Sequence, residues 1–244
     1  LRHRFTALER AKEQGIGHYF VPRYTRVVDT AESKDNINKA YNLISTSKVR
    51  NEMIIDDVIT CVARKQTPVI LTRFKEHAKF LHDALKKKAD HVFLLYGDNS
   101  DKENAEIRVK LKQIPENESL ILVATGQKIG EGFDFPRLDV LMLAAPVSFE
   151  GRLEQYVGRL NRDYVGKEAV YVYDYIDSHV RYFDKMYAKR LRTYRKMGFS
   201  IWTQELQPKQ IINAIFDSVN YTEKFEQDIV ESEKMVVISS PDIR

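Results

Sequence analysis

The sequence contains a single cysteine, Cys61, among its 244 residues. One thiol cannot form a disulfide within the chain, and it cannot by itself build a thiolate zinc cluster. The six histidines are scattered and no two stand at the spacing of metal ligands, so we expect no metal site. Scarce cysteine favours a reducing, intracellular setting, and we expect a cytoplasmic protein.

Long apolar runs are also absent from the sequence. No segment approaches the length that a membrane-spanning helix needs, and the first residues include no apolar stretch of the signal-peptide kind. We therefore expect no membrane partner. A hydrophobic fraction of 43% and a charged fraction of 30% are typical of a globular chain that can bury a core. The net charge of +4 permits a nucleic-acid partner but does not identify one.

A phosphate-binding loop is missing as well. The pattern G-x-x-x-x-G-K-S/T does not occur, and no apolar strand is followed by the acidic residues that hold Mg²⁺ in P-loop enzymes. A nucleotide-sugar or dinucleotide enzyme would show G-x-G-x-x-G after its first strand and an acidic residue about twenty positions later. Neither feature is present, which disfavours this alternative class of enzyme.

Short apolar runs alternate with helical patterns between residues 67 and 174. The runs that we expect to be strands lie at residues 68–71, 92–96, 120–124, 140–144 and 169–173. Near-continuous apolar strands between helices indicate a parallel sheet covered on both faces, and thus an α/β fold. Ahead of them we expect helices at residues 34–44 and 49–64, and strand character at residues 18–21 and 25–28.

Residues 155–162, Q-Y-V-G-R-L-N-R, say most about function. On a helix, Gln155, Arg159 and Arg162 would stand at i, i+4 and i+7 and point from one face. Gly158 leaves that face bare, so that a bulky anion can approach. Two guanidiniums on a rigid face suit the charge that spreads over a phosphoryl group during its transfer. The alternative is an exposed basic helix that is only solvated.

A second segment follows the apolar strand at residues 120–124. Thr125 and Gly126 stand at its carboxyl end, where parallel sheets bind ligands, and a threonine hydroxyl with nearby amides can hold a phosphate. Gly130 and Gly132 allow a tight turn that would aim the Asp134 carboxylate at a ligand hydroxyl.

The segment at residues 120–136 resembles motif V of superfamily 2 helicases and translocases. Residues 155–162 resemble their last motif, motif VI, which reads Q-x-x-G-R-x-x-R. The ends of the first two strands, at Thr72-Arg73 and at Tyr96-Gly97, resemble motif IV and the segment after it. Motif VI beginning with glutamine resembles the restriction-type and DEAD/DEAH-related branch. In this family the P-loop and the Mg²⁺ ligands belong to the first RecA-like lobe, so the chain resembles the second, C-terminal lobe.

The resemblance implies a role for each matched residue. Arg159 and Arg162 would be catalytic as arginine fingers. The nucleotide would be contacted by Gly130, Glu131, Gly132, Asp134, Gln155, Arg159 and Arg162, with Asp134 facing the ribose. The nucleic-acid backbone would be contacted by Thr72, Arg73, Gly97, Thr125 and Gly126. ATP and Mg²⁺ are the implied cofactors, bound mainly by the first lobe, so this chain alone is expected to be inactive.

The resemblance also suggests how the chain is divided. We expect an inter-lobe or N-terminal segment at residues 1–48, a RecA-like parallel sheet with helices on both faces at 49–200, and a helical C-terminal extension at 201–234. Residues 235–244 would start a further domain or simply end the chain. Expected partners are nucleic acid, with DNA favoured over RNA, and the first lobe of the same protein, the whole being a monomer. A non-catalytic nucleic-acid-binding domain is the open alternative, although a pair of arginine fingers argues against it.

Residues 181–196 hold seven basic residues against one acidic residue, Asp184, with aromatic residues among them. We favour an amphipathic helix that buries its aromatic side chains and leaves its basic ones in water. A face that binds the nucleic-acid backbone is the second interpretation.

Overall fold

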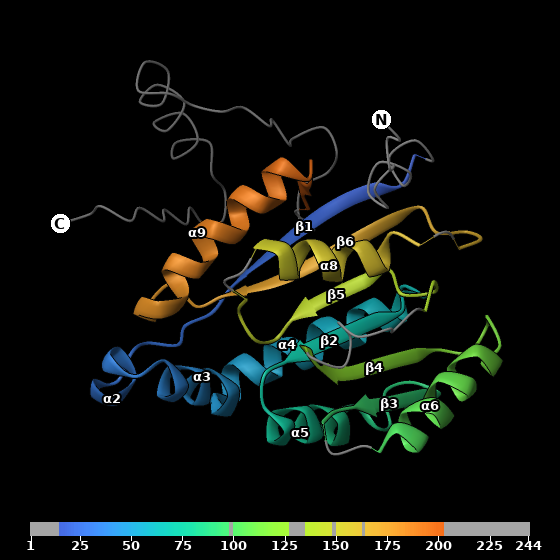
Figure 1. Cartoon of the computed structure of the whole chain (residues 1–244), viewed down its shortest axis with the longest axis horizontal. Helices are drawn as coiled ribbons and strands as arrows, with labels where there is room; N and C mark the ends of the chain where they lie inside the picture. Colours follow the sequence, from blue (N-terminus) through green and yellow to red (C-terminus); the bar gives the residue numbers. More distant parts are fainter. Residues whose placement is uncertain (1–14, 98–99, 127–134, 148–149, 163, 203–244) are drawn as a thin grey trace, which may run out of the picture. The chain divides into compact units, whose positions relative to one another are not determined.

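The computed structural model describes residues 15–97, 100–126, 135–147, 150–162 and 164–202. Its strands are β1 (Gly17–Tyr24), β2 (Pro68–Thr72), β3 (His91–Leu95), β4 (Leu120–Thr125), β5 (Val140–Leu143), β6 (Ala169–Ile176) and β7 (Ser200–Ile201). They form a seven-stranded sheet in the order β3-β4-β2-β5-β6-β1-β7. Every pairing is parallel, so all carboxyl ends lie along one edge, on the left in Figure 1.

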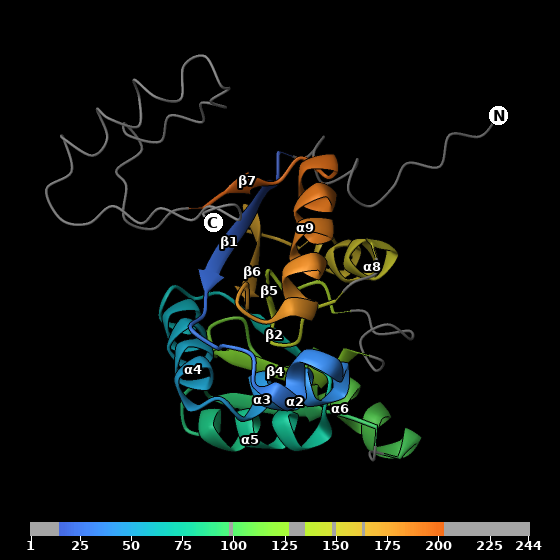
Figure 2. The same cartoon turned by 90° about the vertical axis from the view of Figure 1, so that its left-hand side faces the viewer.

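Helices cover both faces of the sheet, as expected. They are α2 (Ala31–Asp35), α3 (Ile37–Thr46), α4 (Lys48–Ala63), α5 (Lys75–Leu85), α6 (Asp101–Gln113), α8 (Glu150–Leu160) and α9 (Arg181–Lys196). Figure 2 looks onto the carboxyl edge, with α6, α8 and α9 on one side of the sheet and α4 on the other. Successive strand residues point to opposite faces, so Leu71 packs with the first group of helices and Ile70 with α4 and α5. The RecA-like α/β architecture expected from the sequence is confirmed.

The sheet includes part of the segment that we assigned to the region before the lobe. β1 pairs with β6 over its whole length, from Gly17 with Ala169 to Tyr24 with Ile176. Residues 17–48 thus belong to the same compact unit as the sheet. Residues 25–28, which also had strand character, do not form a strand. Residues 203–244, which include nearly all of the expected helical extension, lie outside the described residues.

Two buried arginines hold the loop at residues 144–147 that leads from β5 toward α8. Arg50 on α4 donates to the Asp177 carboxylate at 2.9 and 3.1 Å, and Arg190 on α9 donates to Asp174 at 2.7 and 2.9 Å. Each guanidinium also donates to a backbone carbonyl of this loop. Because these carboxylates are engaged in buried ion pairs, they act as structural groups rather than as an acid/base pair.

Candidate functional site

Helix α8 carries the central part of motif VI. Its inner side buries Leu153, Val157 and Leu160 in the core. Its outer side carries Gln155, which is exposed, and Arg159, which is half-buried. A Cβ added at Gly158 would meet no atom within 4 Å, so the helix backbone between these side chains is open to an approaching anion, as expected.

Arg162 lies beyond the end of this helix. α8 ends at Leu160, so the expected helix does not reach Arg162. The Lys167 ammonium donates to the carbonyls of Leu160 and Arg162, at 2.7 and 3.0 Å, and thereby occupies acceptors at the end of the helix. The Asn161 side chain is buried and lies 2.9 Å from the His18 ring. Arg162 is exposed after this turn, and its catalytic role stays a prediction.

Tyr156 joins α8 to the end of β4. Its hydroxyl donates to the Gly126 carbonyl at 3.1 Å. A Cβ atom added at Gly126 would lie 2.6 Å from the Tyr156 hydroxyl oxygen. A residue with a side chain at position 126 would therefore displace Tyr156. Burial raises the pKa of the Tyr156 hydroxyl and Arg152 lowers it in part, so that the hydroxyl stays a donor. Tyr156 was not predicted from the sequence, because an aromatic residue inside a motif does not reveal which strand it touches.

The glycine-rich turn of motif V lies outside the described residues. This holds for Gly130, Glu131, Gly132 and Asp134, whose nucleotide contacts remain predictions. Thr125 itself ends β4 and is half-buried, directly before Gly126.

Thr72, at the end of β2, is buried and bonded inside the protein. Its Oγ1 lies 2.7 Å from Nδ1 of His77, whose Nε2 lies 2.9 Å from Oδ1 of Asn51. The Asn51 amide nitrogen donates to the Ser45 carbonyl, so Oδ1 accepts from His77 and the Thr72 proton is donated to Nδ1. Burial lowers the pKa of His77 to about 3, which keeps the ring neutral. The expected contact of the Thr72 hydroxyl with a phosphate is therefore not supported.

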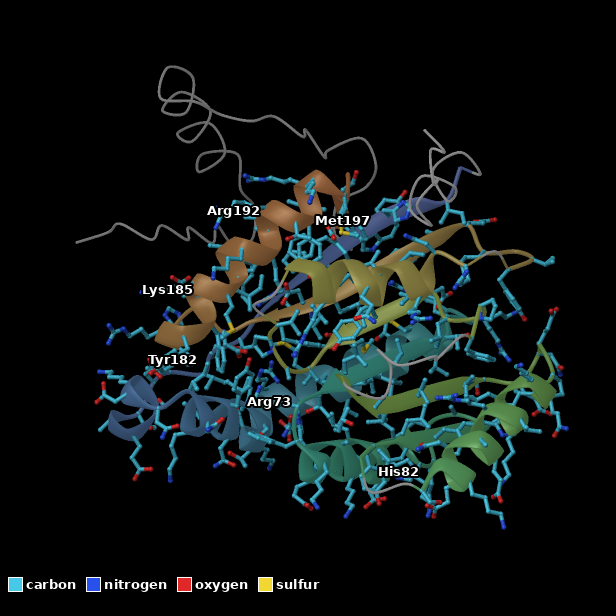
Figure 3. The ribbon with its side chains drawn as sticks, viewed as in Figure 1. Arg73, His82, Tyr182, Lys185, Arg192 and Met197 are labelled. Atoms are coloured by element: carbon cyan, nitrogen blue, oxygen red, sulfur yellow. The ribbon has the colours of Figure 1, made fainter. Side chains whose placement is uncertain are left out.

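Arg73 is exposed at the carboxyl edge (Figure 3). Its guanidinium carbon lies 4.5 Å from the ring centroid of Tyr41, whose hydroxyl donates to the Pro146 carbonyl at 2.8 Å. Burial raises the pKa of Tyr41, whereas the positive charges of Arg73, Arg190 and Arg152 lower it. Arg73 and the exposed Arg152 of α8 are thus both close enough to the Tyr41 hydroxyl to act on it electrostatically. Arg152 was missed because it precedes the motif.

The strand ends that carry the expected nucleic-acid contacts are neighbours. β3, β4 and β2 are adjacent, so Gly97, Thr125-Gly126 and Arg73 follow one another along the carboxyl edge, as their positions after parallel strands predict. Gly97 is exposed, and a Cβ there would meet no atom within 4 Å. Together with Arg152 these residues form a strand-end site that has cations at Arg73 and Arg152 and open backbone at Gly97.

Within the described ranges, no group of three or more His, Cys, Asp and Glu side chains is arranged to hold a metal ion. Within the same ranges, no helix has both the length and the apolar character needed to cross a membrane.

Known proteins provide an independent comparison. No protein-family model matches the sequence. The chain is 28% identical over 172 residues to transcript termination protein A18 of Yaba-like disease virus, covering 66% of this chain and 35% of that protein. It is 34% identical over 118 residues to putative helicase 161L of Invertebrate iridescent virus 6, covering 48% of this chain and 22% of that protein. The chain therefore spans about a third or less of the length of these relatives.

The fold can be compared with solved structures. The crystal structure of UvsW from T4 superimposes with a TM-score of 0.59 at 20% identity, over 77% of this chain and 41% of that one. At this identity the likeness concerns the fold. It agrees with the parallel sheet described above. The chain has the RecA-like fold seen in the second lobe of superfamily 2 helicases and ATPases, and part of its sequence is similar to a putative helicase.

Proposed function

We propose that this chain is the C-terminal motor lobe of an ATP-dependent nucleic-acid helicase or translocase, with Arg159 as an arginine finger. The observation that carries the proposal is the placement of Arg159 beside the open backbone of Gly158, on a helix bonded through Tyr156 to the end of β4. An arginine finger acts through preorganisation, because its charge must already be in position when the transition state forms. The packed inner side of α8 provides that rigidity.

The residues present fit part of an ATP site. The bare helix surface at Gly158 leaves room for phosphate oxygens, and Gln155 and Arg159 can donate hydrogen bonds to them. ATP with Mg²⁺ supplies the phosphoryl group whose hydrolysis would drive movement. The P-loop and the Mg²⁺ ligands would come from the first RecA-like lobe of the same protein. Arg162 stays in the proposal as a second finger from the turn after α8.

Nucleic acid is the proposed substrate of the strand-end site. Arg73 and Arg152 provide cations, and Gly97 provides backbone that a phosphate can approach. Thr125 and Gly126 lie at the neighbouring strand end. Contacts of this kind position a strand without reading its sequence. We propose DNA as the partner, in keeping with the restriction-type branch that motif VI resembles. An RNA transcript is the second candidate, because the Yaba-like disease virus relative is named for transcript termination.

The remaining parts of the proposal concern the setting. We propose that the protein works as a monomer in the cytoplasm. Burial raises the pKa of its single thiol, Cys61, to about 12, so this group would be inert in a reducing compartment.

Arg159→Ala in the protein that contains both lobes tests the function. ATP turnover should fall by about a thousandfold or more, with nucleic-acid affinity largely intact, because the finger acts mainly in the transition state. Arg159→Lys should rescue little, since a point charge lacks the planar fork of a guanidinium. Arg64→Ala, at the end of α4 on the other face of the sheet, is the matched control. Turnover of Arg159→Ala near that of the control would disprove the assigned role.

A further inference from the structure

The outer face of α9 carries positive charge almost exclusively. Its exposed basic residues are Arg181, Lys185, Lys189, Arg192, Arg195 and Lys196. The exposed acidic residue on this helix is Asp184. Five of the basic residues follow at steps of three or four, the spacing that aligns side chains on one side of a helix. We call these five, Arg181, Lys185, Lys189, Arg192 and Lys196, the α9 basic row; Figure 3 shows Lys185 and Arg192 along it.

Two other long helices in the described part of the chain, α5 and α6, mix their charges. α6 holds four basic and three acidic residues, and α5 holds two of each besides its histidines. Mixed signs keep a surface soluble, whereas a single-sign stripe creates a directed field that attracts an oppositely charged partner. The charge pattern of α9 therefore exceeds what solvation of an amphipathic helix requires.

The inner face of α9 holds this row in a fixed position. Phe183 and Tyr194 are buried, as the first interpretation of the segment predicts, and Arg190 is buried with them in its ion pair with Asp174. Within the described part of the chain, the ion pair found for the row joins Lys196 to Glu154 at 3.2 Å, with both side chains well exposed. An exposed ion pair of this kind contributes little free energy, so it leaves the positive charge of the row available to a partner.

The row starts beside the strand-end site. The Phe183 ring centroid lies 4.8 Å from that of Tyr41, the residue on which the Arg73 guanidinium rests. From its first to its last residue the row spans about 22 Å at 1.5 Å per residue. This length corresponds to roughly six base pairs at 3.4 Å each.

We propose that the α9 basic row binds the phosphate backbone of duplex nucleic acid that continues beyond the strand-end site. The inference rests on the proposed function for the kind of partner but uses a separate surface. The row would raise affinity and would not distinguish base sequences, because lysine and arginine contacts with phosphates act by releasing condensed counterions. It would thus favour substrates with a duplex arm over isolated single strands.

The test removes three charges from the middle of the row. Lys185→Gln/Lys189→Gln/Arg192→Gln is compared with the wild type and with Lys86→Gln/Lys87→Gln/Lys88→Gln. The control replaces three exposed lysines after α5. Binding of a fluorescent DNA duplex to the protein is measured by anisotropy across a salt series. Loss of three phosphate contacts should flatten the slope of log affinity against log salt by about 2.7. Between about 50 and 200 mM salt, the variant should lose about forty-fold less affinity than the wild type.

The outcomes are distinct. The inference is overturned if the α9 variant and the lysine control change the slope equally, or if neither changes it. A charge-preserving variant, Lys185→Arg/Lys189→Arg/Arg192→Lys, should keep the wild-type slope, which separates charge from folding defects. Arg73→Ala/Arg152→Ala is measured in parallel. If that variant binds weakly and the α9 variant binds normally, the row has no role while the proposed function stands.

Discussion

The contact between Gly126 and Tyr156 offers a sharp test of how motif V and motif VI are joined. A methyl group at position 126 would come within 2.6 Å of the Tyr156 hydroxyl oxygen but would stay 3.6 Å from Cζ of the same ring. Gly126→Ala must therefore displace the tyrosine, and overpacking of this kind costs about 1–3 kcal/mol. Tyr156→Phe removes the oxygen, and with it both the clash and one hydrogen bond worth about 1 kcal/mol.

The double variant should expose this dependence. With phenylalanine at position 156 the added methyl group makes only an ordinary contact, so Gly126→Ala should then cost close to nothing. Alanine also reduces the entropy of the unfolded chain, which offsets the remaining cost by about 0.4–1 kcal/mol. We expect a coupling free energy of roughly 1–3 kcal/mol between the two substitutions, within the range found for residues in contact.

The measurement is the free energy of unfolding from urea titration of the four proteins in the cycle. Equal slopes of the transitions would show that the substitutions act on the folded state. Gly97→Ala is the control, because a methyl group there meets no atom within 4 Å and should change stability little. If Gly126→Ala has the same cost in the tyrosine and phenylalanine backgrounds, Tyr156 does not join α8 to β4.

Two further predictions concern catalysis and pH. The chain of 244 residues alone should hydrolyse no ATP, since it lacks the lysine and the Mg²⁺ ligands that grip the phosphates; robust magnesium-dependent phosphate release would contradict the half-motor interpretation. Because the pKa of His77 is about 3 in the folded protein against 6.5, its contribution to stability is complete above pH 6.5 and is lost as the pH falls. Between about pH 7 and 5 the wild type should lose about 2 kcal/mol more than His77→Gln in urea titrations. Burial raises the pKa of Asp139 to about 6, so this group changes stability with pH in the opposite direction, but it does so equally in the wild type and in the variant. Equal losses of stability in the two proteins would show that the buried His77 ring is not held neutral.

Much of the fold was predictable because its signals are local. The wholly buried strands β2 and β5 appear in the sequence as unbroken apolar runs, and the helical period of residues 54–62 marks α4. The strand-end positions of Arg73, Gly97 and Thr125 followed from the same runs, since parallel strands share a carboxyl edge. β1 was not placed, because it pairs with β6 across about 150 residues and no local pattern records that choice of neighbour.

The candidate site was predictable in type but not in its connections. The motif predicts that Gln155, Gly158 and Arg159 share a helix. It does not predict that Lys167, from the following turn, donates to the carbonyls at the end of that helix. Thr72 is a reasonable phosphate ligand by sequence, yet its hydroxyl bonds to His77, which itself bonds to a residue of α4.

The sequence by itself determined which residues can carry charge and which segments fold into helices and strands. Tertiary structure decided what each charge does. Arg190 and Arg192 are two positions apart on α9 and chemically identical. Only Arg190 faces β6, where it donates to the buried carboxylate of Asp174. Arg190 is therefore a structural ion pair, whereas Arg192 stays exposed in the basic row, because the packing of the helix selects which of its sides loses contact with water.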